Sequence, residues 1–264
     1  MNGFKSLEKE IKNTQIIILA GGSGKRMGKV DVPKPLLNLN NEKTLLDNEI
    51  EYYARWGFED FVLLIGYKSD MVLEHLEKRK DFIKDLGISI KVSVDPVTKN
   101  WGKGKAIKYA IENGVIDTKK RAIISYPDDL KLDKMLPVKL LVHHLSGKEN
   151  LNIWMTLVLV SAIEFPYGVA HINSQGIITE FVEKPVMDIY TNIGVSMCEP
   201  EVFDIVRDVV DLDADKSIEF EGVVLPILAK KEKIFSMIIP MGTWLPVNDI
   251  KSYEKALSIF NGSV

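Results

Sequence analysis

From residue 15 onward the chain alternates short apolar runs with amphipathic helical patterns, and this alternation limits the possible folds more than any other feature. Short apolar runs predict buried strands, and apolar residues at every third or fourth position predict helices. Strands that alternate with helices are typical of a parallel sheet covered on both faces. The predicted elements are strand 16–20, helix 44–56, strand 61–66, helix 69–86, strand 88–94, helix 105–112 and strand 122–126.

The second half of the chain has a different pattern. Strands are predicted at 153–160, 169–173 and 177–181 with no helix between them, and residues 173–176 predict a hairpin turn. An antiparallel extension of the sheet follows from this order. Further helices are predicted at 200–210, 220–231 and 251–260, the second with a candidate kink at Pro226.

The expected domain organisation is a short arm followed by one domain. Residues 1–14 mix charged and apolar side chains and predict a short amphipathic arm. The domain then covers 15–264, with a first half at 15–150 that carries the alternating elements and a second half at 151–264. No internal repeat or low-complexity linker divides it.

Composition and charge exclude several classes of partner. The chain has 34 basic and 37 acidic residues and no dense stripe of lysine and arginine, so a nucleic-acid partner is not expected. Its apolar runs fall short of the ~20 residues of a membrane helix. The single cysteine, Cys198, cannot form an intrachain disulfide, and no apolar secretory segment opens the sequence. These features favour the cytoplasm.

The turn after the first strand is rich in glycine. Ligands bind parallel sheets at the carboxyl ends of strands, and glycines there let backbone N–H groups approach an anion. The spacing fits neither the dinucleotide fingerprint nor the P-loop, because Arg26 follows Lys25 where the P-loop needs Ser or Thr. Arg26 and Lys34 add two cations, which suits a triphosphate; a tight turn without a ligand is the alternative.

Residues 19–27 and 33–36 together resemble the NTP-dependent sugar-1-phosphate nucleotidyltransferases, whose signature begins L-A-G-G-x-G-x-R-[LM] and ends P-K-P-L. Five further segments match this family in order: 126–130, 167–168, 181–185, 192–194 and 220–228. The resemblance covers nearly the whole chain after residue 15, and it implies a nucleotide-binding half at 15–150 and a sugar-phosphate half at 151–264. It implies an α/β fold with a Rossmann-like, mixed, mainly parallel sheet and an antiparallel sugar-binding extension, as in glycosyltransferase-A-like proteins.

The resemblance also implies a reaction, a cofactor and a set of site residues. The reaction transfers a nucleotidyl group from an NTP to a sugar 1-phosphate, giving an NDP-sugar and pyrophosphate, with Mg²⁺ as cofactor. A homo-oligomer is left open. The implied catalytic residues are Arg26, Lys34, Asp128 and Lys184; the nucleotide-binding residues are Leu19, Ala20, Gly21, Gly22, Ser23, Gly24, Asp95 and Gly104; the sugar-phosphate-binding residues are Tyr167, Gly168, Glu183, Lys184 and Asn192.

The sequence departs from the family pattern at the second metal ligand. Many members have Trp-x-Asp there, whereas Trp244 and Leu245 are followed by Pro246. Residues 247–249 resemble the V-N-N segment of bacterial N-acetylglucosamine-1-phosphate uridylyltransferases, in which an asparagine completes the metal site. The resemblance therefore implies that Asn248 completes the metal site with Asp128, with Asp249 as the alternate. Asp95 stands where the family places a base-reading residue, and a carboxylate can accept from guanine or from uracil, so the base stays open.

Three other functions remain in view. A related enzyme could act on a non-sugar phosphate such as phosphocholine, and a non-catalytic homologue could sense nucleotide sugars. A nicotinamide dehydrogenase is disfavoured by the glycine spacing. His143 and His144 are expected to be solvated on a surface helix, because no Cys or Glu lies at metal-ligand spacing.

Overall fold

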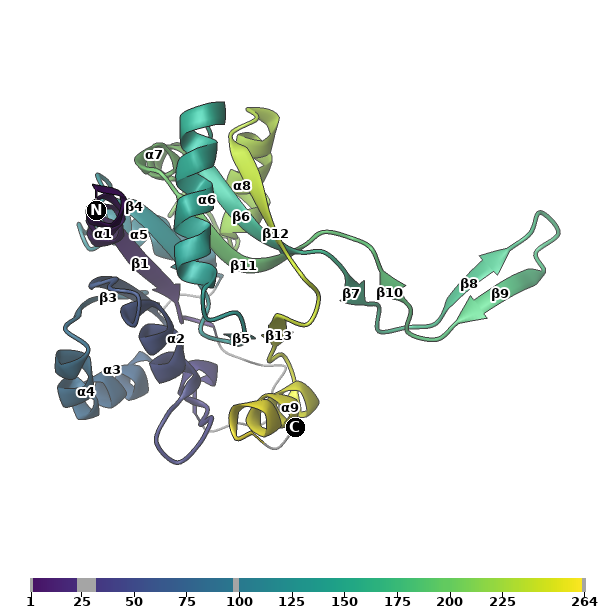
Figure 1. Cartoon of the computed structure of the whole chain (residues 1–264), viewed down its shortest axis with the longest axis horizontal. Helices are drawn as coiled ribbons and strands as arrows, with labels where there is room; N and C mark the ends of the chain where they lie inside the picture. The colour runs from purple at the N-terminus through teal and green to yellow at the C-terminus, as the bar shows by residue number, and fades with distance from the viewer. Residues whose placement is uncertain (1, 23–31, 97–99, 263–264) are drawn as a thin grey trace.

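The computed structural model describes residues 2–22, 32–96 and 100–262, and these residues build a seven-stranded sheet with helices on both faces (Figure 1). The strand order is β12-β6-β11-β4-β1-β2-β3, and within this sheet only β11 runs antiparallel to its neighbours. The predicted mixed, mainly parallel sheet is therefore confirmed. Its strands are β1 Thr14–Leu19, β2 Asp60–Ile65, β3 Ser89–Val94, β4 Arg121–Ser125, β6 Met155–Val160, β11 Thr191–Cys198 and β12 Ile234–Ile239.

The described residues form nine α-helices, and different helices pack on the two faces of the sheet. They are α1 Asn2–Lys12, α2 Leu45–Ala54, α3 Ser69–Lys78, α4 Lys80–Asp85, α5 Lys103–Glu112, α6 Leu136–Leu151, α7 Pro200–Val209, α8 Phe220–Lys230 and α9 Ile250–Phe260, with a 3₁₀ turn, η2, at Lys34–Leu36. Ile16 and Ile18 of β1 join a core cluster with α2 and α6, whereas Ile17 and Leu19 join a cluster with α5, α7 and α8. Alternate side chains of a strand point to opposite faces, which explains why β1 is apolar throughout. Among the described residues no helix is long and apolar enough to span a membrane.

Three pairs of short strands lie outside the main sheet. They are β5 Asp129–Lys131 with β13 Trp244–Pro246, β7 Ile163–Glu164 with β10 Val186–Met187, and β8 Val169–Ile172 with β9 Ile178–Val182. The last two pairs form an arm, residues 163–190, that projects away from the sheet (Figure 1). The predicted hairpin turn closes it: the Asn173 N–H donates to Ile177 O at 2.9 Å, and Gly176 has φ +82°.

Several elements differ from the sequence predictions. The predicted helix 69–86 breaks at Arg79, whose φ of −99° and ψ of 10° separate α3 from α4. Strands β11 and β12 were not predicted. In β11 the apolar alternation is interrupted by Gly194 at φ +80° and by a register shift between Asn192 and Ser196. A bulge of this kind breaks the two-residue period on which strand prediction depends.

The expectation that His143 and His144 are solvated is wrong for His144, which is fully buried. Its Nδ1 lies 2.9 Å from Thr156 Oγ1, and its Nε2 lies 3.0 Å from Glu199 Oε1. Burial lowers the pKa of His144. Glu199 also accepts from Arg121 and Lys148, so this histidine belongs to a buried polar network that ties α6 to the sheet.

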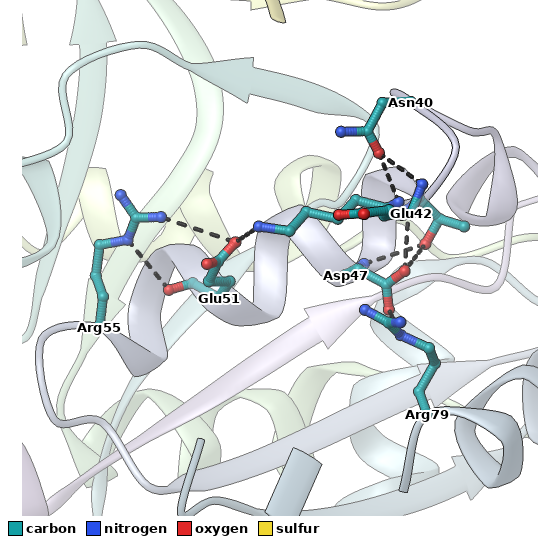
Figure 2. A network of polar contacts seen from close by, with 8 residues as sticks. Asn40, Glu42, Asp47, Glu51, Arg55 and Arg79 are labelled. Atoms are coloured by element: carbon teal, nitrogen blue, oxygen red, sulfur yellow. Dashed lines mark hydrogen bonds and ion pairs between the residues drawn. The ribbon is translucent and has the colours of Figure 1, made fainter. Parts of the chain in front are cut away.

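A second polar network fixes the start of α2 (Figure 2). The Asp47 N–H donates to Thr44 Oγ1 and the Thr44 N–H donates to Asp47 Oδ2, which makes a capping box. Arg79 Nε donates to the same carboxylate at 3.3 Å, and Asn40 Oδ1 accepts from two backbone N–H groups of the preceding loop. This network holds the segment between η2 and α2 in place, and Arg79 connects it to the end of α3.

Candidate functional site

A cleft of about 810 Å³ opens at the carboxyl ends of the parallel strands. Its walls come from the loops after β1, β3 and β4, at the strand ends where ligands of parallel sheets bind. The start of β11 enters the same edge because that strand runs antiparallel to β4. Predicted residues that line the cleft are Leu19, Ala20, Gly21, Gly22, Lys34, Asp95, Asp128, Asn192 and Asn248.

The glycine turn after β1 forms one wall. A Cβ on Gly21 would lie 3.1 Å from Asp95 Oδ2 and 3.3 Å from the Gly66 backbone nitrogen, so a larger residue would push into both. The absence of a side chain lets the turn pack directly on the loops after β2 and β3. Ser23, Gly24 and Arg26 lie outside the described residues, and their predicted roles stay predictions.

Lys34 lies at the floor of the cleft. Its side chain is largely buried, and its Nζ donates to Asp128 Oδ2 at 2.9 Å. The backbone of residues 34–36 forms η2. Pro35 lacks only an N–H that this turn does not need, and Leu37 N–H donates to Lys34 O at 3.1 Å. The Lys34–Asp128 pair joins η2 to the turn after β4.

Asp128 and Asp129 differ in exposure and in hydrogen bonding. The Asp128 side chain is 37% exposed, on the cleft wall. Asp129 accepts from Trp244 Nε1 at 3.0 Å and from the Val247 N–H at 3.3 Å, so it fastens β13 to this loop. Burial, followed by the charge of Asp128, raises the pKa of Asp129 to about 6. Asp128 is thus the more exposed carboxylate of the two, and Asp129 is engaged in holding β13.

A buried ion pair beneath this loop escaped the sequence analysis. Lys131 Nζ donates to both carboxylate oxygens of Glu49 at 2.7 Å and to Tyr126 O at 2.7 Å. Both side chains are almost completely buried. The pair therefore ties the ends of the turn that carries Asp128 to α2. No local pattern links Glu49 to Lys131, because they lie far apart in the sequence.

Beside the glycine turn lie two buried polar atoms without a hydrogen-bond partner in the described part of the chain, Asp95 Oδ1 and Trp101 Nε1. Burial raises the pKa of Asp95 to about 7, while the neighbouring Trp101 side chain acts to lower it. Buried polar groups are normally paired. This acceptor and this donor lie near each other without a well-formed hydrogen bond, so both can serve a polar ligand. Gly104 does not line the cleft; its N–H donates to Ile218 O at 2.8 Å and holds the neighbouring loop.

We expect Asp95→Asn to change the pH dependence of stability. A carboxyl group whose pKa is raised on folding keeps its proton, so its contribution is full below the ordinary pKa of 3.8 and is lost as pH rises through about 7. The variant should therefore melt about 5 °C above the wild type at pH 8, with little difference at pH 4.5. Thermal unfolding at both pH values measures this, and an equal gap at both would contradict the assignment.

Glu221 connects the wall of the cleft to β4. It accepts from Tyr126 Oη at 2.6 Å and from Lys103 Nζ at 2.7 Å. Burial acts to raise the pKa of Glu221, but these two donors hold it below its ordinary value. Gly194 allows the arrangement, because a Cβ there would lie 2.4 Å from the Tyr126 ring. The sequence matched Glu221 to the family without giving it a role.

The predicted sugar-phosphate residues are divided between two places. Asn192 lines the cleft, whereas Tyr167, Gly168, Glu183 and Lys184 lie on the projecting arm and do not line it. Tyr167 is 68% exposed. Phe181 and Glu183 pack over Gly168, where a Cβ would lie 2.3 Å from the Phe181 ring. The structure therefore does not bring this half of the predicted site together within one chain.

The residues proposed for the metal fit a hard cation. Asp128 and Asn248 line the same cleft and offer oxygen donors, and Mg²⁺ binds one or two carboxylates together with substrate phosphates. Asp249, the predicted alternate, instead caps α9 by accepting from the Ser252 N–H at 2.7 Å. In the described residues no group of three or more His, Cys, Asp or Glu side chains is placed to hold a metal ion. This donor set suits a cation shared with substrate.

Comparison with known proteins gives consistent matches. A family model described as nucleotidyl transferase matches residues 15–261. Mannose-1-phosphate guanyltransferase of Kluyveromyces lactis is 28% identical over 94% of this chain, and mannose-1-phosphate guanylyltransferase 1 of Arabidopsis thaliana is 26% identical over 94%. The chain spans 65% of the length of each of these relatives.

Two solved structures share the fold. A Bacillus anthracis protein assigned as a glucose-1-phosphate thymidylyltransferase, in complex with a sucrose, superposes with a TM-score of 0.68 at 21% identity, covering 94% of this chain and 95% of that one. HddC from Yersinia pseudotuberculosis, complexed with GMP-PN, superposes with a TM-score of 0.61 at 22% identity, covering 93% and 99%. The mainly parallel sheet is therefore a shared architecture.

Proposed function

Because this chain belongs to the nucleotidyl transferase family, whose model matches residues 15–261, we propose that it transfers a nucleotidyl group from an NTP to a sugar 1-phosphate. The products are an NDP-sugar and pyrophosphate. One observation carries the proposal: the Lys34–Asp128 pair lines the same cleft as the glycine turn, Asn192 and Asn248. The curated relatives are named for reactions of this class.

The chemistry is an in-line attack of a sugar-phosphate oxygen on the α-phosphorus of the NTP. No protein nucleophile is needed, and the main difficulty is to bring two anions together. The glycine turn offers backbone N–H groups to the triphosphate. Lys34, a buried cation, is placed to stabilise the charge that develops on the reacting phosphate.

Mg²⁺ is the proposed cofactor, held by Asp128 and Asn248. When bound, the ion neutralises phosphate charge and orients the two substrates. One oxygen of Asp128 accepts a hydrogen bond from Lys34 Nζ, so the same carboxylate orients the lysine and lines the cleft. Pro246 pairs with Asp129 across β13 and β5, which keeps the following segment, with Asn248, beside the two aspartates.

We assign the base to the wall formed by Asp95 and Trp101. Asp95 Oδ1 can accept from a base N–H, and Trp101 Nε1 can donate to a base carbonyl. Guanine presents both kinds of group, and the curated relatives are named as guanylyltransferases. GTP and mannose 1-phosphate are therefore the first substrate pair to test. The proposal places the reaction in the cytoplasm, which suits a chain whose only cysteine is a buried free thiol.

The test is pyrophosphate release from each of the four NTPs with a panel of sugar 1-phosphates and with phosphocholine. We expect release that needs both substrates and Mg²⁺, with a sugar 1-phosphate as the preferred acceptor. Preference for phosphocholine would favour the related non-sugar activity. Binding of nucleotide sugars without turnover in any combination would favour a sensor.

A further inference from the structure

The arm, residues 163–190, is the least covered part of the described chain. Every residue of β9 is exposed, and so are most of β8, so both faces of this hairpin lack a neighbour from the same chain. Large apolar side chains concentrate on the arm at exposures of 36% to 68%: Phe165, Tyr167, Ile172, Ile177, Ile178, Phe181, Val182, Val186, Ile189 and Tyr190. Single exposed apolar residues are ordinary, but a contiguous set marks an interaction surface.

The hairpin needs a partner for its own stability. A two-stranded hairpin alone in water is only marginally stable, yet β8 and β9 pair in a defined register closed by the Asn173 turn. Fully covered aromatic side chains bury about 150–250 Å² each. Half-exposed residues of similar size therefore offer on the order of 1,000 Å² on this arm, more than the about 800 Å² per partner of a standard interface.

Among the described residues that line the cleft, each lysine already has an acidic partner. Among its described lining residues are five carboxylates and two lysines. Lys34 is paired with Asp128, and Lys103 is paired with Glu221. A phosphate is best bound by a positively charged side chain. Lys184, on the arm, is exposed and makes no ion pair or hydrogen bond with other described residues.

We propose that two copies of this chain exchange arms, so that Lys184 and Glu183 of each copy complete the cleft of the other. The arm ends at β11, whose second residue, Asn192, already lines the cleft, so an arm is rooted beside each site. A two-fold arrangement exchanges identical elements reciprocally and is the commonest symmetry of oligomers. The exchange covers the apolar arm and brings the Lys184 ammonium group to the cleft of the other copy. This inference rests on the proposed function.

The first test is the oligomeric state of the full chain, measured by light scattering. We expect a dimer, and we expect Ile178→Asp to shift it to a monomer, because a charge would enter the covered arm surface. The matched control is Leu151→Asp, at the end of α6, where the side chain is 56% exposed against 60% for Ile178. This control should stay dimeric. A monomeric wild type, or a dimer that Ile178→Asp leaves intact, would overturn the arm exchange.

The second test is complementation between two inactive variants. Asp128→Ala has a defective cleft and an intact arm, and Lys184→Ala has the reverse. After subunit exchange at equal concentration, one cleft in each mixed dimer is complete, so activity should recover to about one quarter of the wild type. No recovery above the sum of the two variants would show that Lys184 acts within its own chain and would overturn the composite site.

Failure of this inference and failure of the proposed function give different results. If the wild type transfers no nucleotide to any acceptor, the proposed function fails, and the light-scattering test still decides whether the arms are exchanged. If the wild type is active and dimeric but complementation fails, the function stands and the shared site does not.

Discussion

Asp128→Ala is expected to lower the rate of nucleotidyl transfer by about 10³-fold, at the upper end of what one preorganised electrostatic contact contributes. The variant removes the exposed carboxylate of the cleft and also leaves Lys34, a buried cation, without its partner. Steady-state release of pyrophosphate at saturating Mg²⁺ measures the loss. Activity within tenfold of the wild type would remove Asp128 from the reaction.

Two further variants separate loss of chemistry from loss of structure. Asp128→Asn keeps an oxygen that can accept from Lys34 Nζ but lacks the charge that attracts a cation, so it should fold normally and require much more Mg²⁺. Asp204→Ala removes a 70% exposed carboxylate of α7 that pairs with Arg207, and it should leave the rate unchanged. Circular dichroism and thermal unfolding of all three variants check the fold.

Lys34→Met is expected to lower kcat by about 10²-fold or more, because the charge it removes acts on the transition state rather than on substrate binding alone. Methionine keeps much of the length of the side chain, so packing on the floor of the cleft should be preserved. Lys34→Arg is the matched control for charge. It keeps the charge but changes the donor geometry, so we expect partial activity.

The kinetic parameters decide which substrate Lys34 serves. Measurement of kcat, and of the KM for each substrate, should show a fall in kcat, while the KM for the sugar 1-phosphate changes little. A change confined to that KM would show that Lys34 binds the sugar 1-phosphate, and it would contradict the proposal that Lys34 acts on the NTP.

The half of the cleft built on strand ends could be predicted from the sequence. Gly21, Asp95 and Asp128 each lie within two residues of the end of a predicted strand, and carboxyl ends of parallel strands meet at one edge of a sheet. Their proximity therefore needs only the order of elements. Asn248 was placed by its family resemblance, and the structure also brings it to the cleft.

The remaining parts depend on tertiary contacts that no local pattern encodes. The Glu49–Lys131 pair and the burial of His144 join residues far apart in the sequence. β11 escaped prediction because Gly194, which the close approach of the Tyr126 ring requires, interrupts its alternation. The separation of Glu183 and Lys184 from the cleft depends on the direction of the arm, which its sequence does not specify.

The central claim is that the cleft transfers a nucleotidyl group, and the most direct test follows the α-phosphorus of the nucleotide. The protein is incubated with α-³²P-labelled GTP, mannose 1-phosphate and Mg²⁺, or with the best pair from the substrate panel, beside Asp128→Ala. We predict that the label appears in an NDP-sugar in amounts equal to the pyrophosphate released, and that Asp128→Ala gives neither product. Label found only in GDP, with orthophosphate as the second product, would show hydrolysis and contradict the account.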